Sequence, residues 1–334
     1  MPDHRSLSIL RSEDVIVKKF FGKSLVFFVL LAASVITLNF LYINTNYWKN
    51  TVVIERFKNI PEGIQLANVG SSHGLRSFDY SGVPYRSFNF ALNSQRFLYD
   101  YAIIKQYVNK FNKNAVLLIP ISYFEITQIK TNFKDQRARY YHFLDKEYMD
   151  YYSIQEKILF THIPVLTAGT TLRFIIKDQR SSITISRAAK EPDLTKYCIN
   201  KHKSWTSNRR AGIETREKGF VHNKFLVSQM VEFCYAHDIQ PVLVTTPITS
   251  VLNNIFLEKT PDFFDDFYRF KRELQEDYPS LPYFDYSHDP RFENDFSLFY
   301  NGDHLNTHGA KKFTAVVISD LQASGLLAFD ETSR

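Results

Sequence analysis

Two segments that lie far apart in the sequence carry residues able to do nucleophilic chemistry. Residues 70–74 (GSSHG) follow a short apolar run, and residues 301–306 (NGDHLN) precede the last helical pattern of the chain. A serine hydroxyl is a weak nucleophile until a base removes its proton, and a histidine can do this near neutral pH when an acceptor fixes its tautomer. A serine of the first segment and His304 of the second are therefore candidates for acyl-transfer chemistry.

A third polar segment, residues 88–95 (FNFALNSQ), contains donors that suit a developing oxyanion. Asn93 and Ser94 could each supply a side-chain or backbone donor. Both polar segments also have a structural interpretation. A serine of residues 70–74 could simply be the N-cap of a short helix, and residues 93–95 could cap the helix predicted over 94–111.

The elements that must position these residues alternate along the chain. Apolar runs predict strands over 65–69, 86–91, 115–119, 240–245 and 281–286, and helical spacing predicts helices over 94–111, 219–237, 262–277 and 307–321. This alternation predicts an α/β fold with an open parallel sheet and helices on both faces. Ligand sites in such sheets form at the carboxyl ends of the strands. The three polar segments are therefore expected to meet at one edge.

An apolar segment near the N-terminus limits where the protein resides. Residues 24–43 contain no charged side chain, and a helix of that length spans about 30 Å, the thickness of a bilayer core. Residues 1–23 carry five Lys and Arg, and residues 44–63 carry three. The positive-inside rule then keeps the N-terminus in the cytoplasm and sends the C-terminal bulk to the periplasm or cell exterior. A cleaved signal peptide and a buried helix are the alternatives.

The charge of the chain is concentrated in one segment. The net charge of +6 over 334 residues is too small to predict nucleic-acid binding. Residues 128–218, which interrupt the alternation, hold 18 Lys and Arg against 10 Asp and Glu. This segment is either a solvated helical cap or a basic surface that faces an anionic polymer or lipid headgroups.

The polar segments together resemble the motif blocks of the SGNH/GDSL hydrolase superfamily, whose nucleophilic serine follows the first strand and whose base histidine precedes the last helix. On this resemblance Ser72 aligns with the nucleophile and His304 with the base. The residues assigned to oxyanion stabilisation or substrate binding are Asn93, Ser94, Ser122 and Asn301. The resemblance implies a flavodoxin-like three-layer α/β/α domain and no cofactor.

The sequence departs from the superfamily pattern at two places. Asn301 stands where an aspartate is expected three residues before His304, and Asp303 is the nearby acid. Residues 120–124 (PISYF) lack the Gly-x-Asn-Asp block that supplies an oxyanion asparagine. A Ser-His dyad, a triad completed by Asp303 or by a main-chain carbonyl, and reduced or lost activity all remain open from the sequence.

The resemblance is strongest to membrane-anchored members that act on cell-surface polysaccharides. It implies a serine esterase or O-acyltransferase that acts on acyl esters of such a glycan or of an acylated small molecule, with a multi-span membrane acyltransferase as partner. A catalytically inactive polysaccharide-binding or assembly factor is the alternative. The predicted domains are a cytoplasmic segment (1–23), an anchor (24–43), a stem (44–63) and an SGNH-like domain (64–330) with a basic, mostly helical insertion (128–218).

The remaining metal and redox candidates are weaker. The histidines His73, His304 and His308 show no tight metal-ligand spacing, so a metal site is not expected. Cys198 and Cys234 could form a disulfide outside the cytoplasm, or could be buried thiols.

Overall fold

The computed structural model describes residues 4–49, 54–128, 137–167, 175–176, 187–207 and 212–328, with side chains described from residue 17 onward. The chain divides into two compact units. The first combines residues 1–55 with residues 152–181, and the second combines residues 56–151 with residues 182–334. The segment expected as one insertion, residues 128–218, is therefore shared between the two units.

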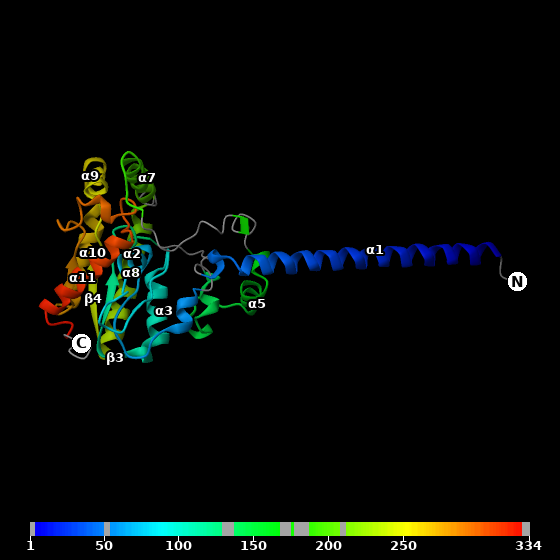
Figure 1. Cartoon of the computed structure of the whole chain (residues 1–334), viewed down its shortest axis with the longest axis horizontal. Helices are drawn as coiled ribbons and strands as arrows, with labels where there is room; N and C mark the ends of the chain where they lie inside the picture. The colour runs from blue at the N-terminus through cyan, green and yellow to red at the C-terminus, as the bar shows by residue number, and fades with distance from the viewer. Residues whose placement is uncertain are drawn as a thin grey trace. The chain divides into compact units, whose positions relative to one another are not determined.

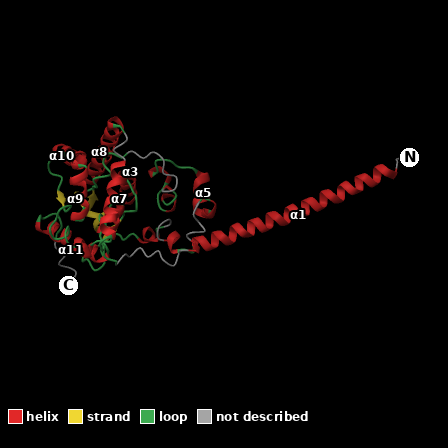
Figure 2. Cartoon of the chain, turned by 90° about the horizontal axis from the view of Figure 1, so that it is seen from above, coloured by secondary structure: helices red, strands yellow, loops and turns green. Residues whose placement is uncertain are grey.

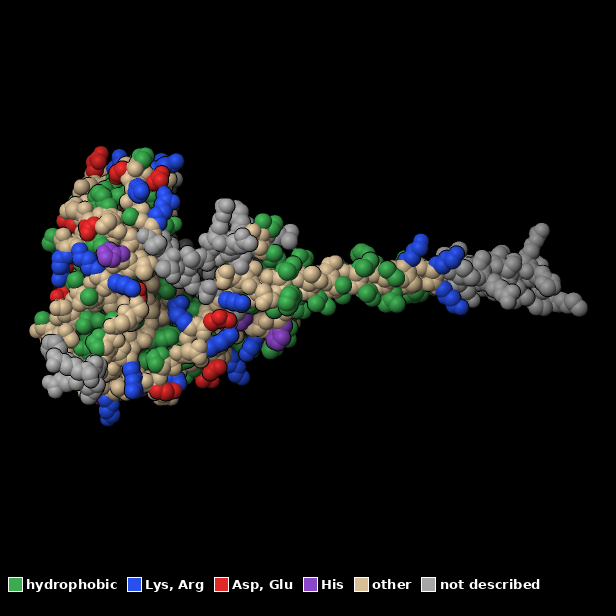
Figure 3. All heavy atoms as spheres, in the orientation of Figure 1, with side chains coloured by type: hydrophobic (Ala, Val, Ile, Leu, Met, Phe, Trp, Pro, Cys, Tyr) green, Lys and Arg blue, Asp and Glu red, His purple; other side chains and the backbone are tan. Residues whose placement is uncertain are grey.

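The first unit is dominated by the long helix α1 (His4–Ile43), which runs without a break (Figure 1). Its part Val17–Ile43 is long and apolar enough to cross a membrane. Hydrophobic side chains are exposed along the described part of the helix, and basic side chains gather toward its N-terminal end (Figure 3). These are the features expected of an anchor with positive charge on one side.

A short helical pair packs against the end of α1 in the same unit. It consists of α5 (Ile154–His162) and η6 (Pro164–Leu166). The Asn39 amide donates to the His162 carbonyl at 3.0 Å and accepts from the Val165 backbone N–H at 3.3 Å. These two bonds hold η6 beside the last turns of α1.

The second unit contains a five-stranded sheet, as the alternation predicted. Its strands are β1 (Ile64–Asn68), β2 (Ser87–Asn89), β3 (Phe111–Pro120), β4 (Ile239–Thr245) and β5 (Tyr283–Asp285). All neighbouring strands are parallel, and their order is β2-β1-β3-β4-β5. From β1 the chain first adds β2 on one side and then crosses to add β3 on the other side, so the strand order reverses between β1 and β3. A parallel sheet opens a crevice for ligands at such a point.

Helices surround the strands of this unit (Figure 2). They are α2 (Ser72–Ser77), α3 (Phe97–Tyr107), α7 (Asp193–Ser207), α8 (Ile213–Ala236), α9 (Ser250–Lys259), α10 (Asp265–Asp277) and α11 (Thr307–Ala323). Short 3-10 helices are η2 (Glu55–Asn59), η3 (Val108–Lys110), η4 (Tyr140–His142), η5 (Lys146–Tyr148), η9 (Pro261–Phe264) and η10 (Phe296–Leu298). The predicted α/β fold is confirmed.

Alternate strand residues build the core on either face of the sheet. One buried cluster joins Leu66, Val116 and Val242 of the strands to Phe313 and other apolar residues of α11, and α2 contacts α11 on this face. Successive strand residues point to opposite faces, and right-handed crossovers place the intervening helices on the second face. There α8 packs on β4 and contacts both α3 and α10. The result is a three-layer α/β/α arrangement.

Several boundaries differ from those that periodicity predicted. The helix expected over 94–111 ends at Tyr107, because the chain turns through η3 and enters β3 at Phe111. The helix α8 begins at Ile213 rather than at 219, and α9 was not predicted. Cys198 and Cys234 are both free, buried thiols, so they do not form a disulfide in this structure.

Candidate active site

The turn after β1 and the loop before α11 meet at the carboxyl edge of the sheet. His304 Nε2 lies 2.9 Å from Ser72 Oγ, within hydrogen-bond distance. The loop that carries His304 is closed by a bond from the Tyr300 backbone N–H to the His304 carbonyl at 2.8 Å. Asn306 then caps α11 by accepting from the Gly309 backbone N–H at 3.0 Å. The structure thus brings the predicted serine and histidine together.

Local backbone features place Ser72 at the start of α2. Gly70 has a φ of 114°, a value that favours glycine, and its N–H donates to Asp100 Oδ1 at 2.8 Å. A side chain at Gly74 would lie 2.4 Å from the Val69 carbonyl oxygen, so only glycine lets α2 approach the end of β1. Ser71 occupies the N-cap position, but its side chain makes no capping bond. The first backbone N–H groups of α2, which include that of Ser72, therefore have no intrahelical partner.

The ring of His304 is oriented by acceptors on its second nitrogen. Its Nδ1 atom lies 3.1 Å from Asn301 Oδ1 and 3.1 Å from Asp303 Oδ1. A proton on Nδ1 that is hydrogen-bonded to Asn301 Oδ1 and favoured by the adjacent Asp303 carboxylate leaves Nε2 with a lone pair directed at the Ser72 hydroxyl. This is the tautomer that a general base requires. Asn301 Oδ1 also accepts from the His304 backbone N–H at 2.9 Å, so this residue shapes the loop as well.

Asp303 is almost completely buried, and three side chains from other elements contact its carboxylate. Tyr197 donates to Oδ1 at 2.5 Å, while Lys201 Nζ and His73 Nε2 lie 3.0 and 3.4 Å from Oδ2. Burial by itself raises the pKa of this carboxyl, but His304 and then His73 hold the pKa of Asp303 well below its usual range. The site therefore contains an ionised carboxylate beside the imidazole.

His73 forms part of the wall behind this carboxylate. Its Nδ1 atom lies 3.3 Å from Thr246 Oγ1, and its ring centroid lies 4.9 Å from that of His304. Burial, opposed by the neighbouring Asp303, lowers the pKa of His73. His73 is thus neutral at pH 7, and its Nε2 atom lies 3.4 Å from Asp303 Oδ2 without meeting hydrogen-bond geometry.

The helix α7 carries Tyr197 and Lys201 to the site from the basic segment. Its docking depends on Gly302, because a side chain there would lie 2.4 Å from Cys198 Sγ. Further along α7, the Trp205 ring stacks on Phe124 with centroids 4.8 Å apart. Part of the predicted insertion therefore contributes directly to the surroundings of Asp303.

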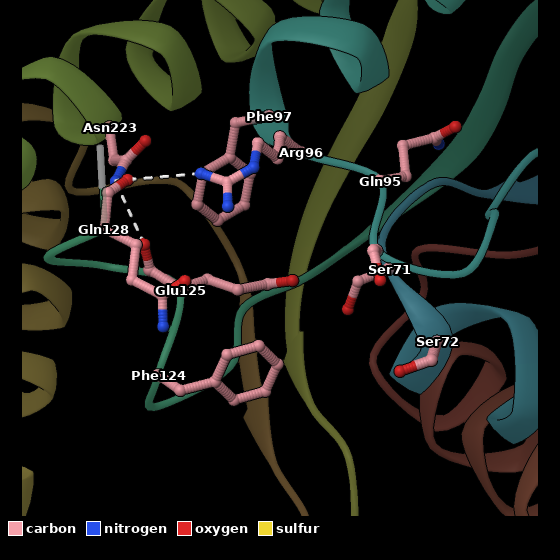
Figure 4. A pocket seen from close by; sticks show the side chains of 10 residues that line it. Ser71, Ser72, Gln95, Arg96, Phe97, Phe124, Glu125, Gln128 and Asn223 are labelled. Carbon is pink, nitrogen blue, oxygen red and sulfur yellow. Dashed lines mark hydrogen bonds between the residues drawn. The ribbon is translucent and has the colours of Figure 1, made fainter. Parts of the chain in front are cut away.

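A small cavity of about 100 Å³ opens beside Ser72 (Figure 4). Its lining combines hydroxyl, amide and charged groups with two aromatic rings, and consists of Ser71, Ser72, Ser94, Gln95, Arg96, Phe97, Phe124, Glu125, Gln128 and Asn223. Asn223 of α8 holds the segment 125–128 in place by donating to the carbonyls of Glu125 at 3.0 Å, Ile126 at 2.9 Å and Gln128 at 3.2 Å. The cavity gives a substrate access to the candidate nucleophile.

Burial raises the pKa of two carboxyl groups near this cavity, Glu125 and Asp100. Burial raises the pKa of Glu125 to about 8, with a further rise from Asp100 and opposing effects of Ser71, Arg96 and Ser122. Burial also raises the pKa of Asp100 to about 7, against hydrogen bonds from Gln95 and Gly70. Glu125 is therefore mainly a neutral carboxylic acid at pH 7.

The other predicted residues differ in whether they line the cavity. Asn93 and Ser94 are exposed in the turn before α3. Ser94 lines the cavity, and its backbone φ is 56°. The Asn93 carbonyl accepts from Arg139 at 2.6 Å. Ser122 is buried, its carbonyl accepts from the Glu125 backbone N–H at 3.0 Å, and its hydroxyl acts on Glu125. The structure does not bring Asn93 or Ser122 into the cavity lining.

Among the described residues, His73, Asp303 and His304 lie close enough to hold a metal ion, with ligand atoms within 4.8 Å of one another. The same atoms already serve other contacts. Lys201 lies 3.0 Å from Asp303 Oδ2, and Ser72 lies 2.9 Å from His304 Nε2. An ion at this position would compete with an ammonium group, which makes the trio a better acid-base cluster than a cation site.

Sequence reasoning did not identify Glu125, Tyr197 or Lys201 as site residues. Glu125 lies only three positions beyond Ser122, and a carboxyl so close to the end of a buried strand was a usable signal. Tyr197 and Lys201 are four positions apart and so share one helix face, but nothing in the sequence of a basic segment indicates which surface that face contacts.

Comparisons with known proteins give little further information. No protein-family model and no curated protein matches the chain. One similar solved structure is a crystal structure from Bacteroides fragilis, described as "a putative acylhydrolase". The two chains are 11% identical, with a TM-score of 0.39, and the likeness covers 84% of this chain and 97% of that one. At that identity and score the likeness carries no argument about activity, so function is inferred below from the site itself.

Proposed function

We propose that this protein is a membrane-anchored serine acyl hydrolase or O-acyltransferase of the SGNH-like type. The observation that carries the proposal is the contact of His304 Nε2 with Ser72 Oγ, combined with the Asn301 amide oxygen and the Asp303 carboxylate, which both lie 3.1 Å from His304 Nδ1. This arrangement holds the imidazole in the tautomer that accepts the serine proton.

In the first half-reaction, Ser72 Oγ attacks the carbonyl carbon of an acyl ester while its proton passes to His304 Nε2. The electron pair of the carbonyl moves onto oxygen, where the free backbone N–H at the start of α2 can donate to it. Collapse of this intermediate breaks the ester bond, and the leaving alkoxide takes the proton from His304. Asp303 stabilises the imidazolium that exists between these two steps.

In the second half-reaction, a hydroxyl compound gives its proton to His304 and attacks the acyl-Ser72 ester. The bond between the acyl carbon and Ser72 Oγ then breaks, and Ser72 Oγ takes the proton back from His304. Water yields a carboxylic acid, and an alcohol yields a new ester. The cavity beside Ser72 carries hydroxyl, amide and charged groups around Phe97 and Phe124, which is a composition suited to a ligand rich in hydroxyl groups. This supports a glycan, or another hydroxylated compound, as the acylated substrate or the acceptor.

The first unit supports attachment to a membrane. The apolar part of α1 is exposed throughout most of its length. The neighbouring α5 adds exposed Ile154, Ile158 and Leu159 to the same unit, and apolar side chains next to a span suit the interfacial region. With the N-terminus in the cytoplasm, the site-bearing unit would lie outside the membrane, where a cell-surface glycan is available and a multi-span acyltransferase could deliver acyl groups.

A serine-reactive fluorophosphonate probe tests this proposal directly. We expect a covalent adduct on Ser72, located by peptide mass spectrometry, and hydrolysis of a small acetyl ester by the full chain in detergent or nanodiscs. Ser72→Ala should lose both signals, whereas Ser81→Ala, at an exposed turn outside the cavity lining, should keep both. If the folded parent forms no adduct and instead binds an acidic glycan in a salt-sensitive way, the protein is a binding factor and the enzymatic proposal is wrong.

A further inference from the structure

The segment that follows β3 carries one acidic side chain aimed at the cavity. The superfamily pattern would supply an oxyanion asparagine near residues 120–124, but this chain has none there. Of the predicted donors, Asn93 lies outside the cavity lining, Ser122 points its hydroxyl at Glu125, and Ser94 lines the cavity but is exposed to solvent. A site that builds negative charge on a carbonyl oxygen needs donors placed in advance, so a second donor besides backbone N–H remains to be identified.

Backbone hydrogen bonds hold Glu125 in place. The backbone N–H donates to the Ser122 carbonyl at 3.0 Å, and the backbone carbonyl accepts from Asn223 at 3.0 Å. The side chain extends into the cavity toward Ser71 (Figure 4). Its carboxyl group, on which the Ser71 and Ser122 hydroxyls also act, therefore lies where a ligand that enters between the segment 125–128 and the start of α2 would meet it.

A second observation at the same place points to a ligand. Ser71 lines the cavity and is buried, with a relative exposure of 3%. Its Oγ atom has no partner that meets hydrogen-bond geometry. Its hydroxyl faces the Glu125 carboxyl closely enough to lower its pKa. An unsatisfied buried hydroxyl is costly unless a ligand or water completes it. The Ser71 and Glu125 pair therefore forms a polar subsite adjacent to the nucleophile.

The groups around Glu125 decide its protonation. Asp100 of α3 is the acidic neighbour and favours the neutral form, whereas Arg96 before α3 favours the ionised form. The hydroxyls of Ser71 and Ser122 also favour ionisation, and α8 contributes the neutral Asn223. Burial outweighs the opposing contacts and raises the pKa of Glu125 to about 8. At pH 7 the neutral carboxylic acid therefore predominates, and it can donate a hydrogen bond.

We propose that Glu125, as a neutral carboxylic acid, donates a hydrogen bond to the oxyanion formed when Ser72 attacks an acyl ester in this cavity. The inference rests on the proposed function and adds a catalytic residue to it. The Ser72 proton still passes to His304, and the carbonyl electron pair moves to the oxygen that Glu125 contacts. Glu125 keeps its proton throughout and is unchanged when the intermediate collapses. A carboxyl kept neutral by burial donates in this way where a carboxylate would repel the oxyanion.

The test compares the parent chain with Glu125→Gln and Glu125→Ala through kcat/KM for an acetyl ester between pH 6 and pH 10. The parent should lose activity above about pH 8 as Glu125 ionises. Glutamine donates a hydrogen bond but does not titrate, so Glu125→Gln should keep activity within about tenfold at pH 7 and lose the alkaline decline. Alanine should lower kcat/KM about 10²- to 10³-fold at every pH, the usual effect of removing one oxyanion donor.

Two results would overturn the inference: an alkaline decline that persists in Glu125→Gln, or a folded Glu125→Ala variant within threefold of the parent. Glu125→Gln keeps the inference testable if the alanine variant does not fold. Probe labelling of Ser72 separates this inference from the proposed function. A parent that is labelled and active while its Glu125 variants behave like it refutes only the role of Glu125, whereas a parent that is neither labelled nor active refutes both.

Discussion

The Nε2 atom of His304 lies 2.9 Å from the Oγ atom of Ser72, a residue 232 positions earlier in the chain. The contact joins the turn after strand β1 to the loop before the last helix α11. Removal of either partner should abolish base-assisted attack. We expect Ser72→Ala and His304→Ala each to lower kcat for an acetyl ester by at least about 10³-fold, with circular dichroism unchanged. Full activity in either folded variant would contradict this assignment.

Asn301 and Asp303 both lie 3.1 Å from His304 Nδ1, but only the aspartate is charged. Asp303→Asn should lower kcat about 10²- to 10⁴-fold, because the imidazolium loses its ionised neighbour and the wrong tautomer becomes available. The double variant that also carries Asn301→Asp has a carboxylate at position 301, where the wild-type amide oxygen lies 3.1 Å from His304 Nδ1. We expect that variant to regain at least about tenfold over Asp303→Asn. No loss in the single variant would show that Asn301 is the sufficient partner.

Lys201 Nζ lies 3.0 Å from Oδ2 of the almost completely buried Asp303 carboxylate. Removal of one partner of a buried ion pair leaves the other charge without compensation. Lys201→Met should therefore lower the free energy of unfolding by about 1–3 kcal/mol, while Lys201→Arg should keep most of the stability, as measured by urea unfolding. A methionine variant as stable as the parent would show that Lys201 does not stabilise the buried carboxylate.

Gly302 allows α7 to pack against the His304 loop, since a Cβ atom there would lie 2.4 Å from Cys198 Sγ. Gly302→Ala should destabilise the fold by about 1–3 kcal/mol through overpacking and reduce activity by displacing Tyr197 and Lys201. The double variant with Cys198→Ala removes the clashing sulfur atom and should recover most of the lost stability. The measurement is thermal or urea unfolding of all four chains, and strictly additive losses would be inconsistent with this packing.

Glu125 should also couple stability to pH. A carboxyl whose pKa is raised on folding binds its proton more tightly in the folded chain, so its contribution is fully present below the unfolded value of about 4.3. That contribution is lost as the pH rises through about 8. The melting temperature of Glu125→Gln relative to the parent should therefore increase from pH 5 to pH 8. A constant difference across this range would mean that Glu125 does not bind its proton more tightly on folding.

Much of the sheet could be predicted because its signals are local. Residues 115–119 and 240–245 are continuous apolar runs, and they form the paired central strands β3 and β4. The alternation of strands and helices predicted a parallel sheet, and so predicted that the polar segments lie at the carboxyl edge of that sheet. The end of the helix before β3 was misjudged, because apolar residues at Val108 and Phe111 continue the helical spacing after the chain has left the helix.

By itself, the amino-acid sequence determined the α/β class, the apolar N-terminal helix, and the polar turns that contain Ser72 and His304. Only the tertiary structure decided which groups surround them. The docking of α7 brings Tyr197 and Lys201 to Asp303, and the packing of the segment after β3 directs Glu125 toward Ser71. These contacts depend on burial and on side chains far apart in the chain, and periodicity reports only local conformation and the side of an element that is apolar.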